Sequence, residues 1–192
     1  MEALQKHAGW GDRGMINKHT LRKDELMRLF FAINFNNKTR SLLLGVQDEV
    51  RYRSSGGSFT LPENLHLTLV FLGECSTKQA MAAKAAMDSI SIDPFDIQVE
   101  RVGRFKRYDG DIWWAAVSRS KPLLDLHSEL TGNLSAAGFN PEKREYKPHI
   151  TLGRRVITDT SPWKVEPFGE TVTRVDLMKS ERIAGMLVYK AI

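Results

Sequence analysis

Two of the five histidines in this 192-residue chain stand in the same four-residue pattern, His-x-Thr-Leu. His66 opens HLTL, and His149 opens HITL 83 positions later. An imidazole, with a usual pKa of about 6.5, can accept or donate a proton near neutral pH, and a threonine hydroxyl can hydrogen-bond an anionic oxygen. Two such pairs brought together would suit acid–base chemistry at a phosphate. One neutral imidazole would take a proton from a nucleophile, and the other, protonated, would give one to the leaving oxygen.

Both patterns lie in apolar runs that predict β-strands, LHLTLVFLG and HITLGR. Successive side chains of a strand point to opposite faces, so His66, Thr68 and Val70 share one face of the first strand. The opposite, buried face then takes the apolar residues Leu65, Leu67, Leu69 and Phe71. His149 and Thr151 share a face of the second strand in the same way. We therefore expect each strand to present a histidine and a threonine side by side.

The repetition extends beyond the two histidine patterns. A shift of 83 residues also places RLFFA at 28–32 on DIWWA at 111–115, so that the two tryptophans align with two phenylalanines. Each copy continues with a helical pattern and then with the His-x-Thr strand, which indicates a duplicated unit. We expect two facing lobes, with one His-x-Thr strand from each at the interface. We also expect Trp113 and Trp114 to lie in the core.

Hydrophobic periodicity and turn residues predict an α+β chain. The expected strands lie at 27–35, 65–73, 95–105, 111–118, 149–154, 171–180 and 186–192. The expected helices lie at 39–52, 77–90 and about 123–137. Ser76 and Gln79 have the spacing of a capping box, and Gly138 favours the end of the third helix. The run SSGGS at 54–58 predicts a flexible loop.

The composition is that of a soluble globular protein, with 42% hydrophobic and 27% charged residues. No apolar run approaches the roughly 18 residues of a membrane span, so we expect no membrane association. The single cysteine, Cys75, cannot form an internal disulfide, which favours a reducing, cytoplasmic setting. Residues 1–26 are polar and aperiodic, so we expect a weakly ordered extension to one monomeric domain at 27–192. The formal charge of +5 fits an anionic ligand such as RNA or a nucleotide.

The other candidates for chemistry lack visible partners. His127 lies on a leucine-bearing helix and is expected to pack or to face solvent, while His7 and His19 fall in the extension. Cys75 has no catalytic partner nearby and is expected to be a buried small residue. Neither histidine pattern has a Cys or a second His at metal-ligand spacing, so we expect no metal and no cofactor.

Basic residues accompany the second half of the repeat. ERVGRFKRYDGDIWW at 100–114 interleaves basic and aromatic residues, which indicates either a track for a nucleic-acid backbone or a solvated loop beside a buried strand. Arg154 and Arg155 follow the second histidine pattern directly. Strict alternation places Arg155 on the histidine face and Arg154 on the other, and a β-bulge would exchange them.

With these motifs the chain resembles the 2H phosphoesterase superfamily, defined by two H-x-[ST]-hydrophobic motifs. Within it, the chain resembles the RNA 2′,3′-cyclic phosphodiesterases, also called the 2′-5′ RNA ligase family. The stretches MRLFFAI, ENLHLTLVFLGE, IWWAAV and GF followed by KPHITLGR carry the resemblance, which spans about residues 27–192. It implies a bilobal, LigT-like α+β fold. Two pseudo-twofold-related lobes of antiparallel sheet with helices would flank an active-site groove.

The resemblance also implies an activity, the metal-independent opening of a 2′,3′-cyclic phosphate on an RNA end or a nucleotide to give the 2′-phosphate. His66 and His149 would be the catalytic pair, with His66 favoured as the acid and His149 as the base. Thr68, Thr151 and Arg154 would bind the phosphate. Some members of the family also join 2′-5′ RNA ends.

Two alternatives stay open at this point. One is a non-catalytic module of the same fold that binds AMP or another nucleotide. The other is a 2H phosphodiesterase that acts on a small cyclic nucleotide or on a 2′-5′ linkage. Both histidines and both threonines are intact, which favours catalysis over binding alone.

Overall fold

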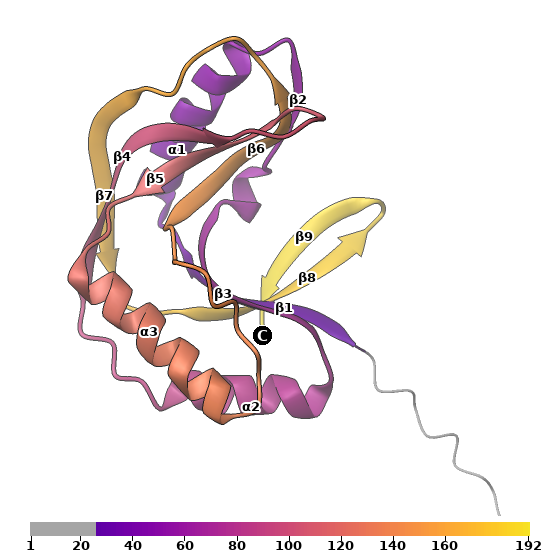
Figure 1. Cartoon of the computed structure of the whole chain (residues 1–192), viewed down its shortest axis with the longest axis vertical. Coiled ribbons are helices and arrows are strands. Elements are labelled where there is room, and N and C mark those ends of the chain that lie inside the picture. The colour runs from indigo at the N-terminus through magenta and orange to yellow at the C-terminus, as the bar shows by residue number, and fades with distance from the viewer. Residues whose placement is uncertain (1–25) are drawn as a thin grey trace, which may run out of the picture.

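Over residues 26–192, which the computed structural model describes, nine strands form two antiparallel sheets accompanied by three α-helices (Figure 1). The α+β class predicted from the sequence is therefore confirmed, and each sheet holds one His-x-Thr strand. The expected weakly ordered extension lies, apart from residue 26, outside the described residues.

Sheet A has four strands in the order β3-β1-β8-β9. Their bounds are Met27–Asn34 for β1, His66–Cys75 for β3, Asp176–Ile183 for β8 and Met186–Ala191 for β9. The strand that opens with His66 lies at one edge of this sheet, beside the first strand of the chain. The hairpin of the last two strands completes the sheet.

Sheet B has five strands in the order β2-β6-β5-β4-β7. Their bounds are Gly56–Phe59 for β2, Phe95–Phe105 for β4, Asp111–Val117 for β5, His149–Ile157 for β6 and Lys164–Val172 for β7. The strand that opens with His149 is bordered on both sides, by the short β2 and by β5. The two histidine strands thus differ in their place within a sheet.

Local sequence signals set the helix ends. The helices are α1 at Asn37–Tyr52, α2 at Thr77–Asp88 and α3 at Lys121–Ala136, and a 3-10 turn, η1, spans Pro62–Asn64. Ser76 and Gln79 make both hydrogen bonds of the predicted capping box at the start of α2. Past the end of α3, Gly138 has a φ of 88°, a left-handed conformation that glycine adopts without strain.

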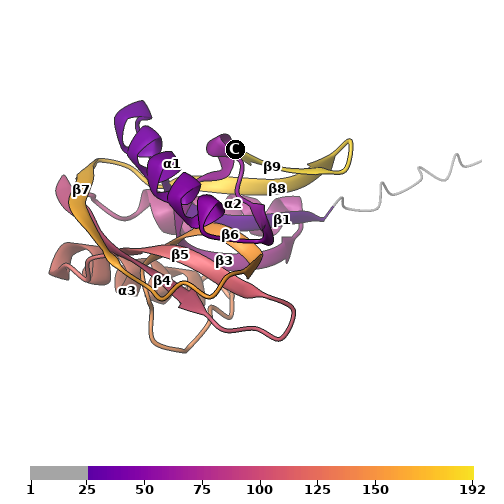
Figure 2. The same cartoon turned by 90° about the horizontal axis from the view of Figure 1, so that it is seen from above.

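The helix of each repeat packs away from its own histidine strand. Although α1 joins β1 to the stretch leading into β3, it contacts β2, β5, β6 and β7 of sheet B. In the second copy, α3 joins β5 to β6 but contacts α2 and β3, and of sheet B mainly β4. Figure 1 shows α1 beside sheet B, and α2 and α3 side by side below β3 and β1. In the turned view of Figure 2, α1 and α3 lie on opposite sides of the strands. Each of these helices thus packs on the sheet that holds the other copy's histidine strand, which links the two sheets.

One continuous cluster of buried apolar side chains joins the two sheets and the helices. Leu67 and Ile150, the residues between each histidine and its threonine, are both fully buried in it. A smaller cluster of Phe30, Ala32 and Met178 lies apart from it in sheet A. Burial of the residue between histidine and threonine fixes the face on which each His-Thr pair lies.

The structure departs from the expected elements in three places. The strand expected at 171–180 is interrupted at 173–175, which separate the end of β7 from the start of β8. The predicted loop at 54–58 overlaps β2, which pairs with β6 and in which Gly57 has a φ of 148°. The strand β7 was not predicted, because Pro167 interrupts its pattern. It pairs on one side only, with β4, and an edge strand tolerates a proline because one row of its N–H groups needs no partner.

The shift of 83 residues misaligns the first strands of the two copies by one position. Ala32 pairs with Thr68, whereas Trp114 pairs with Thr151, so the equivalent residues of β1 and β5 are 82 positions apart. A slip of one residue exchanges the two faces of a strand. Trp113 is accordingly fully buried as predicted, but the prediction that Trp114 lies in the core was wrong. Its half-buried ring lies on the face of His149.

Candidate active site

His66, the first residue of β3, is enclosed by aromatic rings. The centroid of its imidazole lies 4.9 Å from that of Phe30 and 5.1 Å from that of Tyr189. Its Nδ1 lies 2.7 Å from the carbonyl oxygen of Asn64, which can only accept, so Nδ1 carries the hydrogen. In the neutral ring Nε2 is then the basic nitrogen, and the hydroxyl of Thr68 lies 2.9 Å from it.

His149, the first residue of β6, has the same backbone anchor and a more open ring. Its Nδ1–H donates to the carbonyl oxygen of Lys147 at 2.7 Å, which again leaves Nε2 as the basic nitrogen. The ring centroids of Phe105 and Trp114 lie 5.4 and 6.2 Å away. Within residues 26–192 no side chain or backbone group hydrogen-bonds its Nε2, in contrast to the Nε2 of His66.

Electrostatics makes the two histidines and Arg154 mutual neighbours. Burial lowers the pKa of His66, its hydrogen bond to the Asn64 carbonyl opposes this, and the positive charges of Arg154 and His149 lower it further. Burial also lowers the pKa of His149, and Arg154 again adds to the effect. Burial and the charge of Arg154 thus both favour the neutral form of each ring.

Two register shifts between β5 and β6 decide where Arg154 lies. Trp114 pairs with Thr151 but Trp113 pairs with Gly153, so one extra residue stands between them and the side chain after Gly153, that of Arg154, falls on the face of His149. The second shift leaves Arg154 and Arg155 together opposite Ile112, and Arg155 has a φ of 53°. Arg155 turns outward and pairs with Asp109 at 3.2 Å. A Cβ on Gly110 would lie 2.6 Å from the carbonyl carbon of Arg155, so a glycine is required beside the bulge. The faces given by strict alternation are thus exchanged.

A bulge in β3 also changes which side chains face His66. The register with β1 shifts so that Leu69 and Val70 both point to the core, at 3% and 5% exposure. Phe71 then faces Phe30 and is 49% exposed. The prediction from alternation was therefore wrong from Val70 onward: Val70 leaves the face of His66, and Phe71 joins it.

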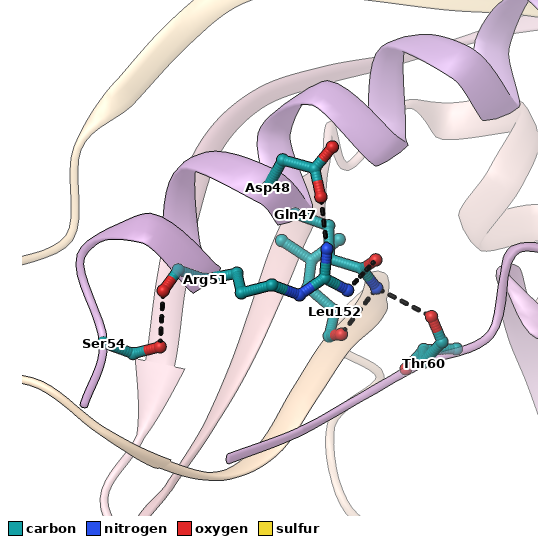
Figure 3. A network of polar contacts seen from close by, with 6 residues as sticks. All are labelled: Gln47, Asp48, Arg51, Ser54, Thr60 and Leu152. Atoms are coloured by element: carbon teal, nitrogen blue, oxygen red, sulfur yellow. Dashed lines mark hydrogen bonds and ion pairs between the residues drawn. The ribbon is translucent and has the colours of Figure 1, made fainter. Parts of the chain in front are cut away.

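A buried glutamine holds the backbone beside the second threonine (Figure 3). Gln47 of α1 donates from Nε2 to the carbonyl oxygens of Thr60 and Leu152, both at 2.8 Å. The hydroxyl of Thr60 donates to the carbonyl oxygen of Thr151 at 2.9 Å. The chain that leads into η1 and β3 is thereby tied to β6.

Two further residues support the His66 side. The side chain of Asn64 donates to the carbonyl oxygen of Leu187 at 2.7 Å and accepts the N–H of Tyr189 at 3.2 Å. Tyr146 donates its hydroxyl to the carbonyl oxygen of Thr68 at 2.9 Å. Neither residue belongs to a His-x-Thr pattern, and no local feature of the sequence indicates the contacts that their side chains make. Their role depends on segments that meet only in the fold.

The remaining candidates stay outside the site. His127 was expected either to pack or to face solvent, and it packs: its ring is stacked on that of Tyr146, with 4.0 Å between the centroids. Cys75 is buried, and burial raises the pKa of its thiol. His7 and His19 lie outside the described residues. Among residues 26–192, no group of three or more His, Cys, Asp or Glu side chains is placed to hold a metal ion. In that part of the chain no helix is long and apolar enough to cross a membrane.

Comparison with known proteins gives consistent matches. The model of the 2′-5′ RNA ligase superfamily matches residues 47–183. A Thermotoga maritima protein named RNA 2′,3′-cyclic phosphodiesterase is 32% identical over 131 residues, which are 67% of this chain and 70% of that protein. An Archaeoglobus fulgidus protein of the same name is 30% identical over 155 residues, or 77% of this chain and 87% of that protein.

Solved structures agree with the sequence matches. The crystal structure of E. coli LigT complexed with 3′-AMP superposes with a TM-score of 0.74 at 25% identity, covering 88% of this chain and 95% of that one. The superposition spans both sheets and not a single lobe, because it includes nearly all of the described residues.

Proposed function

The chain belongs to the 2′-5′ RNA ligase superfamily, and from this premise we propose that it hydrolyses a 2′,3′-cyclic phosphate on an RNA end or a nucleotide to the 2′-phosphomonoester. The names of the two curated relatives support the substrate class. The observation that carries the proposal is the pairing of two imidazoles. Both are anchored through Nδ1 to a backbone carbonyl, and both lie in the field of Arg154.

Two proton transfers complete the reaction. The oxygen of a water molecule attacks phosphorus while the Nε2 of one neutral histidine takes its proton. The bond from phosphorus to the 3′ oxygen breaks, and that oxygen receives a proton from Nε2–H of the other histidine. The 2′ oxygen keeps the phosphate, and the proton count balances without a metal-bound water.

Exposure supports the assignment of the two roles. His149 has the more open Nε2, which suits the histidine that takes a proton from water. His66 is the more enclosed of the two, by Phe30 and Tyr189, which suits a donor to the leaving oxygen. We therefore assign His149 as the general base and His66 as the general acid.

A bound phosphate would raise the low pKa of His66, the proposed acid. Arg154 and the hydroxyls of Thr68 and Thr151 are proposed to bind the non-bridging phosphate oxygens. A phosphate placed there offsets the positive charge of Arg154 that lowers the pKa of both histidines. Its negative charge then favours protonation of His66, so the acid gains its proton with the substrate.

The same groups can serve attack by a second nucleophile. A 5′-hydroxyl of a second RNA in place of water would displace the 3′ oxygen and leave a 2′-5′ linkage. We propose this ligation as a side reaction of the same site, since it uses the same two proton transfers.

The test is the position of the phosphate in the product. The protein is incubated in EDTA with a 2′,3′-cyclic nucleotide and with an oligoribonucleotide that ends in the same group. Release of the 2′-phosphate supports the proposal, and a 3′-phosphate would overturn the assigned geometry. Saturable binding of AMP with no turnover of either substrate would indicate the non-catalytic alternative.

A further inference from the structure

An exposed aromatic ring with an arginine over it lies beside the His66 site. The ring of Phe71 is 49% exposed, although Phe71 belongs to a strand with a buried side. The Cζ atom of Arg28 lies 4.9 Å from the centre of this ring. Neither residue has a part in the proposed chemistry.

The strand register places this pair on the face of His66. β1 pairs with β8 without irregularity, so Arg28 and Phe30 point to the same side of sheet A. Phe30 contacts the ring of His66 and faces Phe71 across the register. Side chains that face each other on antiparallel strands have Cβ atoms about 5 Å apart. The bulge in β3 is thus what brings Phe71 to the catalytic side.

The surface from His66 to this pair is continuous. Tyr189 contacts both Phe30 and His66, at 5.0 and 5.1 Å between ring centroids. The charges of both Arg154 and Arg28 oppose the rise that burial causes in the pKa of Tyr189. Tyr189 therefore lies near both the guanidinium of Arg154 and the guanidinium over Phe71.

The chemistry of the pair fits a nucleotide of an RNA chain. An exposed aromatic side chain stacks with any base, and a neighbouring arginine can hydrogen-bond a phosphodiester. Within residues 26–192 Arg28 forms no ion pair, not even with Glu74, which faces it in the strand register. Phe71 follows His66 by five positions, about 15 Å along a strand, which is beyond a single nucleotide held at His66.

We propose that Phe71 and Arg28 form a subsite for the RNA chain on the 5′ side of the nucleotide that carries the cyclic phosphate. One base stacks on Phe71, and Arg28 binds the phosphodiester that follows. This inference rests on the proposed function and adds that the substrate is an oligoribonucleotide end, since a mononucleotide leaves the subsite empty.

The test compares two substrates in matched variants. The ratio of kcat/KM for a six-residue oligoribonucleotide with a 2′,3′-cyclic end to that for the mononucleotide is measured. We expect Phe71→Ala to lower this ratio about 5- to 150-fold, the range of one lost base stack. Arg28→Ala lowers it as well, and it reduces the slope of log affinity against log salt concentration by about 0.7, as for one lost phosphate contact on a single strand. Tyr52→Ala, which removes a surface ring that is 89% exposed at the end of α1, should leave the ratio unchanged.

Binding separates this inference from the proposed function. Fluorescence anisotropy measures affinity for oligoribonucleotides of one to six residues that end in a 2′-phosphate. We expect affinity to rise when a second and a third nucleotide are added, and Phe71→Ala to remove that rise. No turnover by the unmodified protein together with this length dependence would overturn the hydrolysis and keep the subsite. Equal losses for short and long ligands, or no loss, would overturn the subsite.

Discussion

The two His-x-Thr strands carry the same pattern in different surroundings. His66 begins an edge strand, is covered by Phe30 and Tyr189, and receives the hydroxyl of Thr68 on Nε2. His149 begins a strand that is paired on both sides, yet its Nε2 has no partner in the described part of the chain. The backbone anchor is the same in both, a carbonyl two residues before the histidine.

The difference teaches that a duplicated motif fixes the tautomer but not the role. A carbonyl at Nδ1 leaves Nε2 as the reactive nitrogen in both copies. The degree of burial then differs, because the rings of Phe30 and Tyr189 lie closer to His66 than the rings of Phe105 and Trp114 lie to His149. Two identical side chains can thus be placed on opposite sides of one acid–base reaction.

The largest expected effect comes from removing either histidine. Each of His66→Ala and His149→Ala should lower kcat about 10²- to 10⁴-fold, the usual contribution of a general acid or base. A cyclic substrate with sulfur in place of the 3′ oxygen separates the roles, because a thiolate leaves without prior protonation.

That substrate should restore most of the activity of His66→Ala and none of the activity of His149→Ala. Circular dichroism of both variants serves as the folding control. Rescue of His149→Ala alone would reverse the two assignments, and rescue of neither would contradict a leaving-group acid.

A smaller effect is expected from the buried amides that support the two halves. Gln47→Ala and Asn64→Ala each leave buried backbone groups unpaired, which costs about 1–3 kcal/mol in the free energy of unfolding. Asp48→Ala, which removes an exposed ion pair with Arg51 beside Gln47, should cost less than about 1 kcal/mol. Urea denaturation measures all three.

Titration of the two imidazoles by NMR then shows whether each amide affects only the histidine nearest to it. Asn64→Ala should change the pKa of His66 more than that of His149, because the side chain that is lost holds the backbone of Tyr189, whose ring lies against His66. Gln47→Ala should change the environment of His149 more, through Leu152. Equal changes at both histidines would contradict the division into two independently supported halves.

The smallest expected effect is a shift in the pH profile of kcat/KM. Tyr189→Leu admits water to His66 and weakens the burial that lowers its pKa, so that pKa rises toward the usual value. The proposed acid must be protonated, so the alkaline limb of the profile moves to higher pH.

Phe105→Leu is the matched change on the other half, beside His149. The proposed base must be neutral, so a raised pKa moves the acidic limb to higher pH while the alkaline limb stays. Movement of the acidic limb in Tyr189→Leu would show that His66 is the base.

Much of the fold follows from local sequence patterns. The strand at 95–105 and the capping box at Ser76 and Gln79 were predicted as the structure has them, because a strand period and a cap depend on neighbouring residues. The family expected from the two histidine motifs is also confirmed by the match over residues 47–183. The strand β7 escaped prediction because its proline is tolerated only at a sheet edge, and sequence does not state which strands are edges.

The sequence by itself determined that two histidines and two threonines are presented as pairs, because alternation along a strand is a local property. Only the tertiary structure decided which neighbours join them. Bulges in β3 and β6 bring Phe71 and Arg154 to the histidine faces, and a shift by one residue does the same for Trp114. A bulge arises where two strands with different residue counts must pair, so it depends on the partner strand as much as on its own sequence.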